Sequence, residues 1–456
     1  MGGANLETWP EAMEARAKSA GEILRGFGIS LLTGGTHQIL KHGLPGNWLT
    51  FESFDGDSKA CETRLRTLQD QGFCFKFWFS PFWFFAEAEG GLEPHREYLL
   101  KDANGNPVTQ RFEQGGWEFG RGPWSEKPLT KVYLDATHPG TRSFLRRIFT
   151  AYRALGGRAY MLDFLRMPTG AQPPDDRLLP LELGRKILSI IRDATGEDTH
   201  LQTAVASSPG FIGCIQAARV VRDYGEERPL HPTPNWRNAE YCLHDRHFAD
   251  AHSFVQNAAA SWFTHRKLYI NDLNQIKLDL PVPLELARLS ATMFGLSGDS
   301  PMVIGDDPRR MAPERLRLLK MCLPRTTGVP VPVDLFERVA PEDFCHVLKK
   351  PVATDWDEYT LVAVFNTSPD HQAPVTDAFQ TRIGFDGLGL PAHASYRVFD
   401  VWNQHYLGTY RGSFGCCVPP DACRLYRVTP ARPHPWLLGS DMHIEQGRGE
   451  IESLAW

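Results

Sequence analysis

Residues 156–168 read GGRAYMLDFLRMP, and their pattern decides the fold class. The run holds a single carboxylate, Asp163, among large apolar side chains. Such a run is typical of a parallel strand that is covered on both faces, where an uncompensated charge costs several kcal/mol. Asp163 therefore needs either a compensating partner or a chemical role.

An amphipathic helix leads directly into this strand. We expect Thr137 to cap the helix and Pro139 to lie in its first turn. The apolar residues of this helix share one face: Leu145, Ile148, Phe149, Tyr152 and Leu155. A helix followed by a buried strand is the building unit of a parallel α/β sheet.

Seven strand patterns of this kind alternate with helical patterns between about residue 10 and about residue 325. They are FGISLLTGG (27–35), FCFKFWFSP (73–81), AYMLDFL (159–165), HLQTAVASS (200–208), ARVVRD (218–223), KLYINDLN (267–274) and PMVIGDD (301–307). Seven is one short of a closed barrel, so we predict a (β/α)₈ barrel of the TIM type whose first strand is missing or irregular. We expect another segment, residues 1–10, to fill the gap, because an open sheet edge invites aggregation.

Two further regions depart from the alternating pattern. Residues 83–136 are too long for an ordinary connection, which makes them a candidate lid or wall over the barrel mouth. Beyond about residue 330, short alternating runs are separated by Gly, Pro and Asp, as in an antiparallel β-sandwich. We therefore predict a barrel domain over 1–330 and a C-terminal β-sandwich over 331–456.

The composition argues against several classes of partner. The 456 residues include 49 basic and 54 acidic side chains, and a net charge of -5 offers no broad field for nucleic acid or anionic membranes. Nine cysteines lack zinc-type spacing, which indicates reduced thiols and no metal. No signal-like segment, membrane-length apolar run or nucleotide-binding glycine motif is present, so we expect a cytoplasmic protein without a cofactor.

Several predicted strands carry their one acidic residue where the active site of such a barrel lies, at the carboxyl ends. We expect Asp163, Asp223, Asp272 and Asp299 to meet at that rim. Asp163 and Asp223 lie two strands apart, which places their backbones about 10 Å apart. Their side chains can then close to the roughly 5 to 9 Å at which paired carboxylates hydrolyse glycosidic bonds. Arg219 is placed to hold a sugar hydroxyl or to keep a carboxylate charged. The alternative is a set of structural ion pairs.

Tryptophan rings suit the faces of sugars, and Trp48, Trp78 and Trp236 are the candidates for stacking; core packing is the alternative. Two other chemistries fit less well. The run GLSGDS lacks the second glycine of a nucleophile elbow, which argues against a serine hydrolase. The histidines of HDRHFADAH do not return to one helix face, which argues against a metal site.

Taken together, these motifs resemble the melibiase-type α-galactosidases of glycoside hydrolase clan D, family thirty-six-like. The resemblance spans most of the chain from about residue 46. The matching runs are GFCFKFWFSPFW (72–83), YMLDFLRM (160–167), ASSPGFIGCIQAARVVRDYG (206–225), the segment 266–324 and the final HPWLLGSDMHIEQGRGEIESLAW (434–456).

This resemblance implies a retaining exo-α-glycosidase without metal or organic cofactor. Asp163 would be the nucleophile, Asp223 the general acid/base and Arg219 a sugar ligand. The chain departs from the family at the end of the second strand, where LTGGTH (32–37) stands in place of Asp-Asp-Gly-Trp, and at Met161, where the family has a lysine. His37 thereby becomes a candidate substrate ligand, and the sugar is left open.

We therefore predict an enzyme that hydrolyses terminal α-linked sugars of oligosaccharides or glycoconjugates. A close variant is another α-glycosidase or a transglycosylase that uses the same two aspartates. The rival from a different class is a non-catalytic barrel that binds carbohydrate. The sequence makes no prediction of the oligomeric state.

Overall fold

The structure of the protein is a computed structural model. It describes residues 2–5, 25, 31–33, 46–49, 58–88, 91–112, 128–165, 178–204, 209–221, 251–280, 282–337, 345–367 and 376–454. Within these ranges, no helix is long and apolar enough to cross a bilayer.

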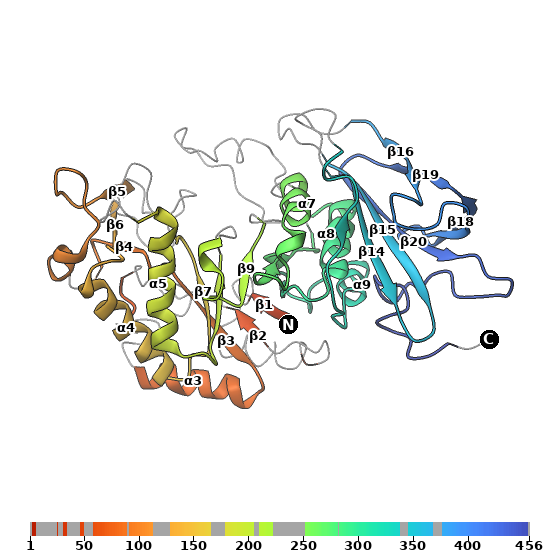
Figure 1. The fold of residues 1–456 in the computed structure, drawn as a ribbon. Coiled ribbons are helices and arrows are strands. Elements are labelled where there is room, and N and C mark those ends of the chain that lie inside the picture. The colour runs from red at the N-terminus through yellow and green to blue at the C-terminus, as the bar shows by residue number, and fades with distance from the viewer. Residues whose placement is uncertain are drawn as a thin grey trace.

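A parallel sheet forms the first part of the chain (Figure 1). Along the described chain its strands are β1 (Gly2–Asn5), β2 (Leu31–Thr33), β3 (Cys74–Phe79), β7 (Ala159–Leu162), β8 (His200–Thr203), β9 (Ala217–Arg219), β10 (Ile270–Asp272), β11 (Gln275–Ile276) and β12 (Met302–Ile304). Their order in the sheet is β10-β9-β8-β7-β3-β2-β1-β12-β11. Because β10 and β11 are two halves of one stretch of chain, the sheet closes into a barrel.

The barrel confirms the seven strands predicted from the sequence and corrects the prediction for the first one. A first strand is present: β1 pairs in parallel with both β2 and β12. It lies within residues 1–10, the segment expected to fill the gap. A glycine-rich segment has no apolar pattern to reveal it, so only its backbone pairing defines it as a strand.

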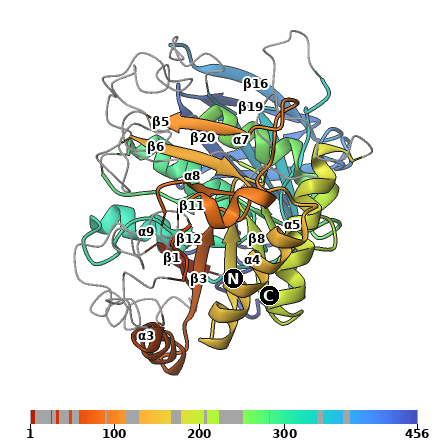
Figure 2. The same cartoon turned by 90° about the vertical axis from the view of Figure 1, so that its left-hand side faces the viewer.

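Helices cover the outside of the barrel (Figure 2). They are α3 (Ser58–Asp70), α4 (Pro139–Ala154), α5 (Pro180–Thr195), α7 (Ala251–Ala260), α8 (Leu284–Leu296) and α9 (Pro313–Met321), with short 3₁₀ turns η3 (Glu93–Tyr98), η4 (Pro209–Phe211) and η5 (Trp262–Thr264). The predicted face of α4 is buried, but His138 caps this helix in place of Thr137, since its ring accepts a hydrogen bond from the Gly140 N–H at 3.0 Å.

Packing of α4 against the barrel determines which side chains face inward. Phe77 and Phe79 of β3 point outward, and their rings meet Tyr152 and Phe149 of α4 at 5.0 and 4.9 Å. Successive residues of a strand alternate between the two faces of the sheet. Lys76 and Trp78, which alternate with these phenylalanines, therefore face the barrel interior.

An antiparallel insertion separates β3 from α4, at the left of Figure 1. Its strands β4 (Trp83–Phe85), β5 (Thr109–Phe112) and β6 (Leu129–Tyr133) form a sheet in the order β4-β6-β5. Its core consists of Trp83, Phe85, Leu100, Leu129 and Tyr133. Trp78 and Phe164 of the barrel pack against this core, so the insertion touches the barrel beside Asp163.

Antiparallel strands make up the C-terminal part. One sheet has the order β13 (Val331–Pro332), β14 (Val347–Ala353), β15 (Glu358–Asn366), β20 (Ala422–Pro430), β17 (Ser395–Asp400) and β18 (His405–Arg411); the second pairs β16 (Phe379–Gly384) with β19 (Ser413–Val418). The change from parallel to antiparallel pairing falls between β12 and β13. This change supports a boundary near residue 330, which remains a prediction.

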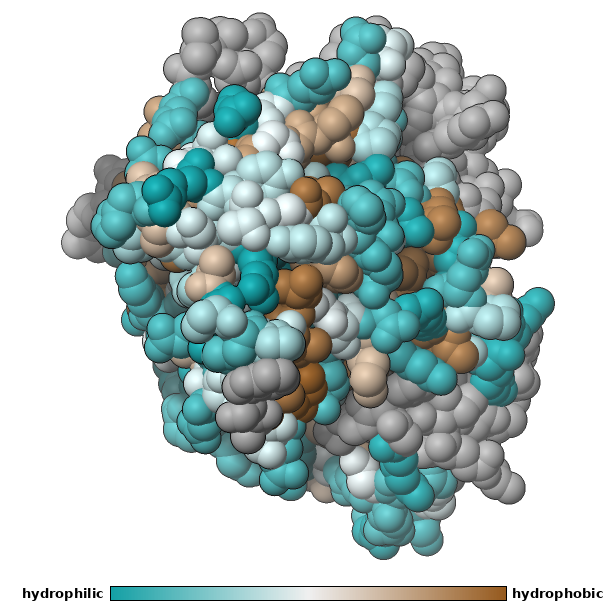
Figure 3. All heavy atoms as spheres, turned by 90° about the vertical axis from the view of Figure 1, so that its right-hand side faces the viewer, coloured by the Kyte–Doolittle hydropathy of each residue, from teal (hydrophilic) through white to brown (hydrophobic). Residues whose placement is uncertain are grey.

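The larger sheet of the sandwich is the middle layer of three. Along β15, Leu361 and Ala363 belong to the core shared with the barrel, whereas Val362 and Val364 belong to the core under β16 and β19. Helix α8 packs against this sheet, and the Trp402 indole donates a hydrogen bond to Thr292 Oγ1 at 3.0 Å. The exterior at the sandwich end is largely hydrophilic, with hydrophobic residues in small groups (Figure 3).

Candidate active site

Asp163 directly follows β7, at the carboxyl end of the barrel. Its N–H still donates to the Phe79 carbonyl of the neighbouring strand β3 at 2.8 Å. Successive side chains along β7 point to opposite faces of the sheet, so Asp163 shares the interior face with Ala159 and Met161. Tyr160 and Leu162 point outward and are buried among the aromatic rings there. The residue is half-buried, and its carboxylate lies at the rim of the barrel interior.

Two donors hold the two oxygens of this carboxylate. The Trp78 indole N–H donates to Oδ2 at 3.1 Å, and the Phe164 backbone N–H donates to Oδ1 at 2.8 Å. Hydrogen bonds to an ionised acceptor are stronger than those between neutral groups. The half-buried carboxylate that the sequence singles out therefore has hydrogen-bond partners on both oxygens, and these partners fix its orientation.

Arg219 ends β9, and only β8 separates this strand from β7. Leu162 and Ala218 are both in register with Thr203, so Asp163 and Arg219 follow at the same level of the sheet. At the ordinary strand spacing, their backbones are about 10 Å apart. The strands that were predicted to carry Asp163 and Asp223, β7 and β9, are thus two apart, as predicted. Asp223 itself, four residues beyond Arg219, lies outside the described residues, and its separation from Asp163 stays a prediction.

A chain of buried polar side chains crosses the barrel interior. The Lys76 ammonium donates to Gln202 Oε1 at 3.0 Å, and the Gln202 amide donates to the Asp272 carboxylate. Asp272 is fully buried and also accepts from the Asn274 N–H at 2.9 Å. Arg219 and Asp272 are in register on neighbouring strands, so two cations and one anion share this interior.

Burial shifts the pKa of both ends of this chain. Loss of hydration lowers the pKa of Lys76 to about 8, against the opposing attraction of Asp272. Burial also raises the pKa of Asp272, against the opposing attraction of Lys76 and Arg219. The network therefore runs up the barrel interior, from Lys76 in register with Ala159, through Gln202 in register with Met161, to Asp272 in register with Arg219 near the level of Asp163.

The sequence led to Asp272 and Arg219, but Lys76 and Gln202 were missed. A signal was present, because Lys76 is the one charged residue in FCFKFWF, as Asp163 is in its own strand. Gln202 carries a weaker signal, since an amide in a strand is not unusual. Neither position shows its partner in the sequence, because the contact joins strands 126 residues apart.

The prediction that Asp299 belongs to the same rim is wrong. Asp299 precedes β12, so it lies at the amino end of that strand, opposite the rim that holds Asp163. Its carboxylate accepts from Arg266 at 2.8 Å and from the Gly328 N–H at 2.6 Å. The contact with Arg266 connects the loops that precede β10 and β12, at the amino ends of the strands.

The tryptophans that were candidates for sugar stacking lie in different environments in the structure. Trp78 lies at the rim against Asp163, as described above. Trp48 is 4 % exposed and packs in the core against Phe79 at 5.9 Å, which corrects the expectation that it stacks on a sugar. His37 and Trp236, and the histidines His244 and His247, lie outside the described residues.

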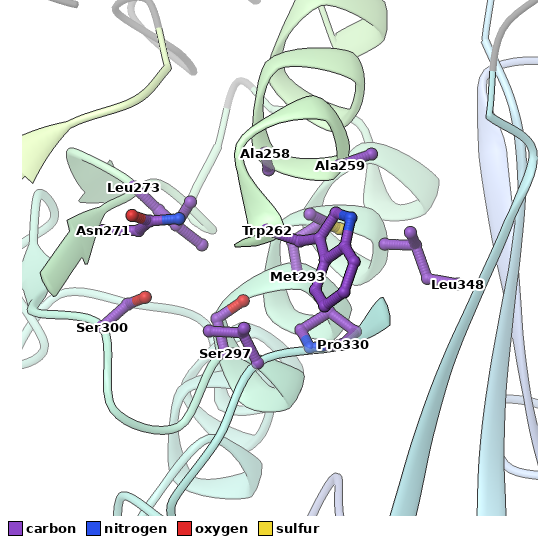
Figure 4. Close-up of a pocket in the computed structure, with 11 residues that line it drawn as sticks. Ala258, Ala259, Trp262, Asn271, Leu273, Met293, Ser297, Ser300, Pro330 and Leu348 are labelled. Carbon is purple, nitrogen blue, oxygen red and sulfur yellow. The ribbon is translucent and has the colours of Figure 1, made fainter. Parts of the chain in front are cut away.

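A small recess lies elsewhere, outside the barrel wall between β10, α7, α8 and the sandwich (Figure 4). Trp262 stands in its middle, with Asn271 and Leu273 on one side and Leu348 of β14 on the other. Both ends of the Asn271 amide already make hydrogen bonds within the protein: its oxygen accepts from the Thr264 hydroxyl, and its NH₂ group donates to the Ser261 carbonyl. No carboxylate lines this recess, so it is not a continuation of the Asp163 rim.

Comparison with known families identifies the C-terminal part. Residues 343–428 match the alpha galactosidase C-terminal beta sandwich domain. This range covers β14, β15, β16, β17, β18 and β19 and most of β20. The C-terminal module that the sequence predicted is therefore of the type found in α-galactosidases.

Solved structures resemble most of the chain, from the barrel through the sandwich. A family 27 β-L-arabinopyranosidase from Geobacillus stearothermophilus is 11% identical, with a TM-score of 0.61 over 94% of this chain and 97% of its own. α-Galactosidase I from Mortierella vinacea is 12% identical, with a TM-score of 0.56 over 94% and 97%. The isomalto-dextranase of Arthrobacter globiformis T6, solved with panose, is 17% identical, with a TM-score of 0.56 over 94% and 72%.

These likenesses establish the fold as a TIM-type barrel followed by a β-sandwich. At such low identity, they extend to the fold and not to the activity. The sandwich match agrees with the melibiase-type resemblance, one of these structures is named as a family 27 enzyme, and the finer family-thirty-six-like assignment is not confirmed.

Proposed function

We propose that this protein is a retaining exo-α-glycosidase in which Asp163 is the nucleophile and Asp223 the general acid/base. The observation that carries the proposal is the Asp163 carboxylate at the carboxyl end of β7, oriented by Trp78 and by the Phe164 N–H. The α-galactosidase-type sandwich and the names of the matched structures, all glycosidases, support the same class.

In the proposed reaction, one Asp163 oxygen attacks the anomeric carbon while Asp223 donates its proton to the departing glycosidic oxygen. The bond to the leaving group breaks as the glycosyl ester with Asp163 forms. A water molecule then gives its proton to Asp223 and attacks the same carbon, which releases the sugar with its configuration retained. Retention requires carboxyl groups about 5 to 5.5 Å apart, which two inward side chains on strands two apart can reach.

Arg219 ends β9 at the level of Asp163 and is suited to bind a hydroxyl next to the reacting carbon. Trp78 has its indole N–H on Asp163, so its ring is fixed beside the anomeric position. The substrates of the matched structures span galactosides, arabinopyranosides and isomalto-dextran by their names. We infer a terminal α-linked hexopyranoside, or the β-L-arabinopyranoside that has the same ring configuration as an α-galactoside.

The test is hydrolysis of aryl α-galactoside, α-N-acetylgalactosaminide, α-glucoside and β-L-arabinopyranoside by the wild type and by Asp163→Ala. We expect one substrate to be turned over, and Asp163→Ala to lower kcat/KM on the order of 10⁴-fold. Azide should restore turnover of an activated substrate by entering the space of the missing carboxylate. Asp193→Ala, on the outer helix α5 where it pairs with Arg142, is the matched control and should keep full activity. Folded wild type without activity on any of the four substrates would instead favour a non-catalytic, carbohydrate-binding barrel.

A further inference from the structure

Phe164, the residue after the proposed nucleophile, has a backbone conformation that bulky residues avoid. Its φ is +54°, in the left-handed region that is costly for side chains other than glycine or asparagine. The same peptide supplies the N–H that donates to Asp163 Oδ1 at 2.8 Å. The orientation of the carboxylate therefore depends on something that holds Phe164 in this conformation, since strained backbone persists only when its surroundings fix it.

The insertion between β3 and α4 provides that support. The Phe164 ring meets the edge of Trp83 at 5.6 Å, and the Lys131 ammonium lies 5.0 Å from the centre of the Phe164 ring. The same ammonium lies 4.3 Å over Trp83 and 5.4 Å over Tyr133. Lys131 is 5 % exposed, so this cation is enclosed by three aromatic rings, one of which belongs to Phe164.

Two of the three rings around Lys131, those of Trp83 and Tyr133, belong to paired strands of the insertion, as does Lys131 itself. In the ladder between β4 and β6, Trp83 pairs with Tyr133 and Phe85 pairs with Lys131. The contacts between rings and cation are stronger here than on an open surface, because cation–π attraction grows when water is excluded. A rigid small sheet thus presents Lys131 and Trp83 to one side chain of the barrel rim.

We propose that the insertion of residues 83–136 serves to aim the nucleophile, and that Lys131 is a positioning residue for it. Lys131 and Trp83 hold the Phe164 ring, the ring fixes the left-handed backbone, and the backbone N–H orients the Asp163 carboxylate toward the anomeric carbon. Together with Trp78, this clamp restrains both carboxylate oxygens. The inference rests on the proposed role of Asp163 and assigns the insertion a part in that reaction.

The test measures formation of the glycosyl–enzyme directly. Wild type and variants are treated with 5-fluoro-α-D-galactosyl fluoride and 5-fluoro-α-D-glucosyl fluoride, and the rate and concentration dependence of covalent labelling are recorded by mass spectrometry. Loss of alignment at a reacting atom lowers the rate by about 10- to 100-fold. We expect Lys131→Met to lower the maximal labelling rate by that factor with the half-saturating concentration unchanged, and Lys131→Arg to restore most of it, because a guanidinium also stacks on rings.

Glu93→Ala is the matched control within the insertion. Glu93 lies on η3, is exposed and pairs with Arg96 at 3.2 Å. This change removes a surface ion pair without touching the three rings around Lys131, and it should leave the labelling rate unchanged. If Lys131→Met does not fold, Phe164→Leu removes the same ring contact and should lower the labelling rate in the same way.

Two outcomes would overturn the inference in distinguishable ways. A folded Lys131→Met variant that labels Asp163 at the wild-type rate would disprove the positioning role and leave the proposed function intact. Wild-type protein that neither probe labels at Asp163 and that hydrolyses none of the four aryl glycosides would refute the proposed function, and the role of Lys131 would fall with it.

Discussion

Asp163 and Lys76 show two ways in which the interior of this barrel accommodates a charged side chain. Asp163 stands at the rim, half-buried, with two donors on its oxygens and access to a ligand. Lys76 lies deeper on β3 and is 1 % exposed, so its charge is compensated only within the protein. The position along the strand decides whether a polar residue can act on a substrate or only shape the field around it.

Because the pKa of Lys76 is depressed, the free energy of unfolding of the protein should depend on pH. In the folded protein this ammonium loses its proton near pH 8, whereas in the unfolded chain it keeps the proton to about 10.5. The unfolded state therefore binds more protons between these values, and stability rises with pH in this window by up to about 3 kcal/mol. Below about pH 8 the cost of burying the charge is present in full.

Urea unfolding of the wild type and of Lys76→Met between pH 7 and pH 11 checks this expectation. Other groups that titrate in this range, such as buried tyrosines and cysteines, remain in both proteins and cancel in the difference. The stability of the wild type should increase relative to that of the variant between pH 8 and 10.5. A difference that stays flat across the window would show that the folded lysine titrates normally.

At the scale of elements, the barrel closes through one broken strand. The sequence predicts a single strand in KLYINDLN, but the structure has β10 and β11, joined by Leu273 and Asn274. The first half pairs with β9 and the second with β12, so this break lets one segment bridge the two ends of the sheet. Asn274 has a φ of +66°, which makes the change of direction.

Asn274 tests the importance of this break. Asparagine and glycine tolerate positive φ, whereas alanine pays about 1 to 2 kcal/mol for it. We expect Asn274→Gly to leave the free energy of unfolding within about 0.5 kcal/mol of the wild type and Asn274→Ala to lower it by about 1 kcal/mol. Chemical denaturation of the three proteins gives the order. Equal losses in both variants would mean that the Asn274 side chain, and not its backbone, is what the fold requires.

The elements also show what the sequence could predict. Strands such as β3 and β7 were found because burial on both faces requires an apolar run, and Asp163 stood out against that run. β1 lies in the segment that closure of the sheet led us to expect, but GGAN has no such pattern and its own residues did not indicate a strand. The cap of α4 was assigned to Thr137, but Thr137 instead donates to Asp135 and leaves His138 to cap the helix. Contacts between distant segments, such as Lys76 with Gln202 or Lys131 with Phe164, leave no local pattern.

At the scale of the whole molecule, the barrel and the sandwich share one core. The barrel helix α8 is buried along almost its whole length from Ala287 to Leu296, because the barrel covers one side and the six-stranded sheet the other. The sandwich therefore covers the outer face of α8, on the side of the barrel away from the insertion. The insertion and the sandwich lie at opposite ends of the molecule in Figure 1.

A buried ion pair joins these parts. Lys350 of β14 contacts Glu445 of the C-terminal segment, and it also donates to the Leu296 carbonyl at the end of α8 at 2.6 Å and to the Gly328 carbonyl at 3.2 Å. Lys350 is 3 % exposed and Glu445 is fully buried. Barrel, linker, sandwich and C-terminal segment thus meet at one ammonium group.

Removing one partner of this pair should cost more than removing both. Glu445→Leu leaves the Lys350 charge buried with only carbonyl acceptors, and a buried charge that loses its partner costs about 3 to 5 kcal/mol. The double change Lys350→Met with Glu445→Leu removes both charges, so we expect it to be at least about 1 kcal/mol more stable than the worse single variant. Urea unfolding of the four proteins gives the coupling energy. Single losses that simply add in the double variant would show that the two groups act independently, and that the carbonyl contacts of Lys350 alone join the barrel to the sandwich.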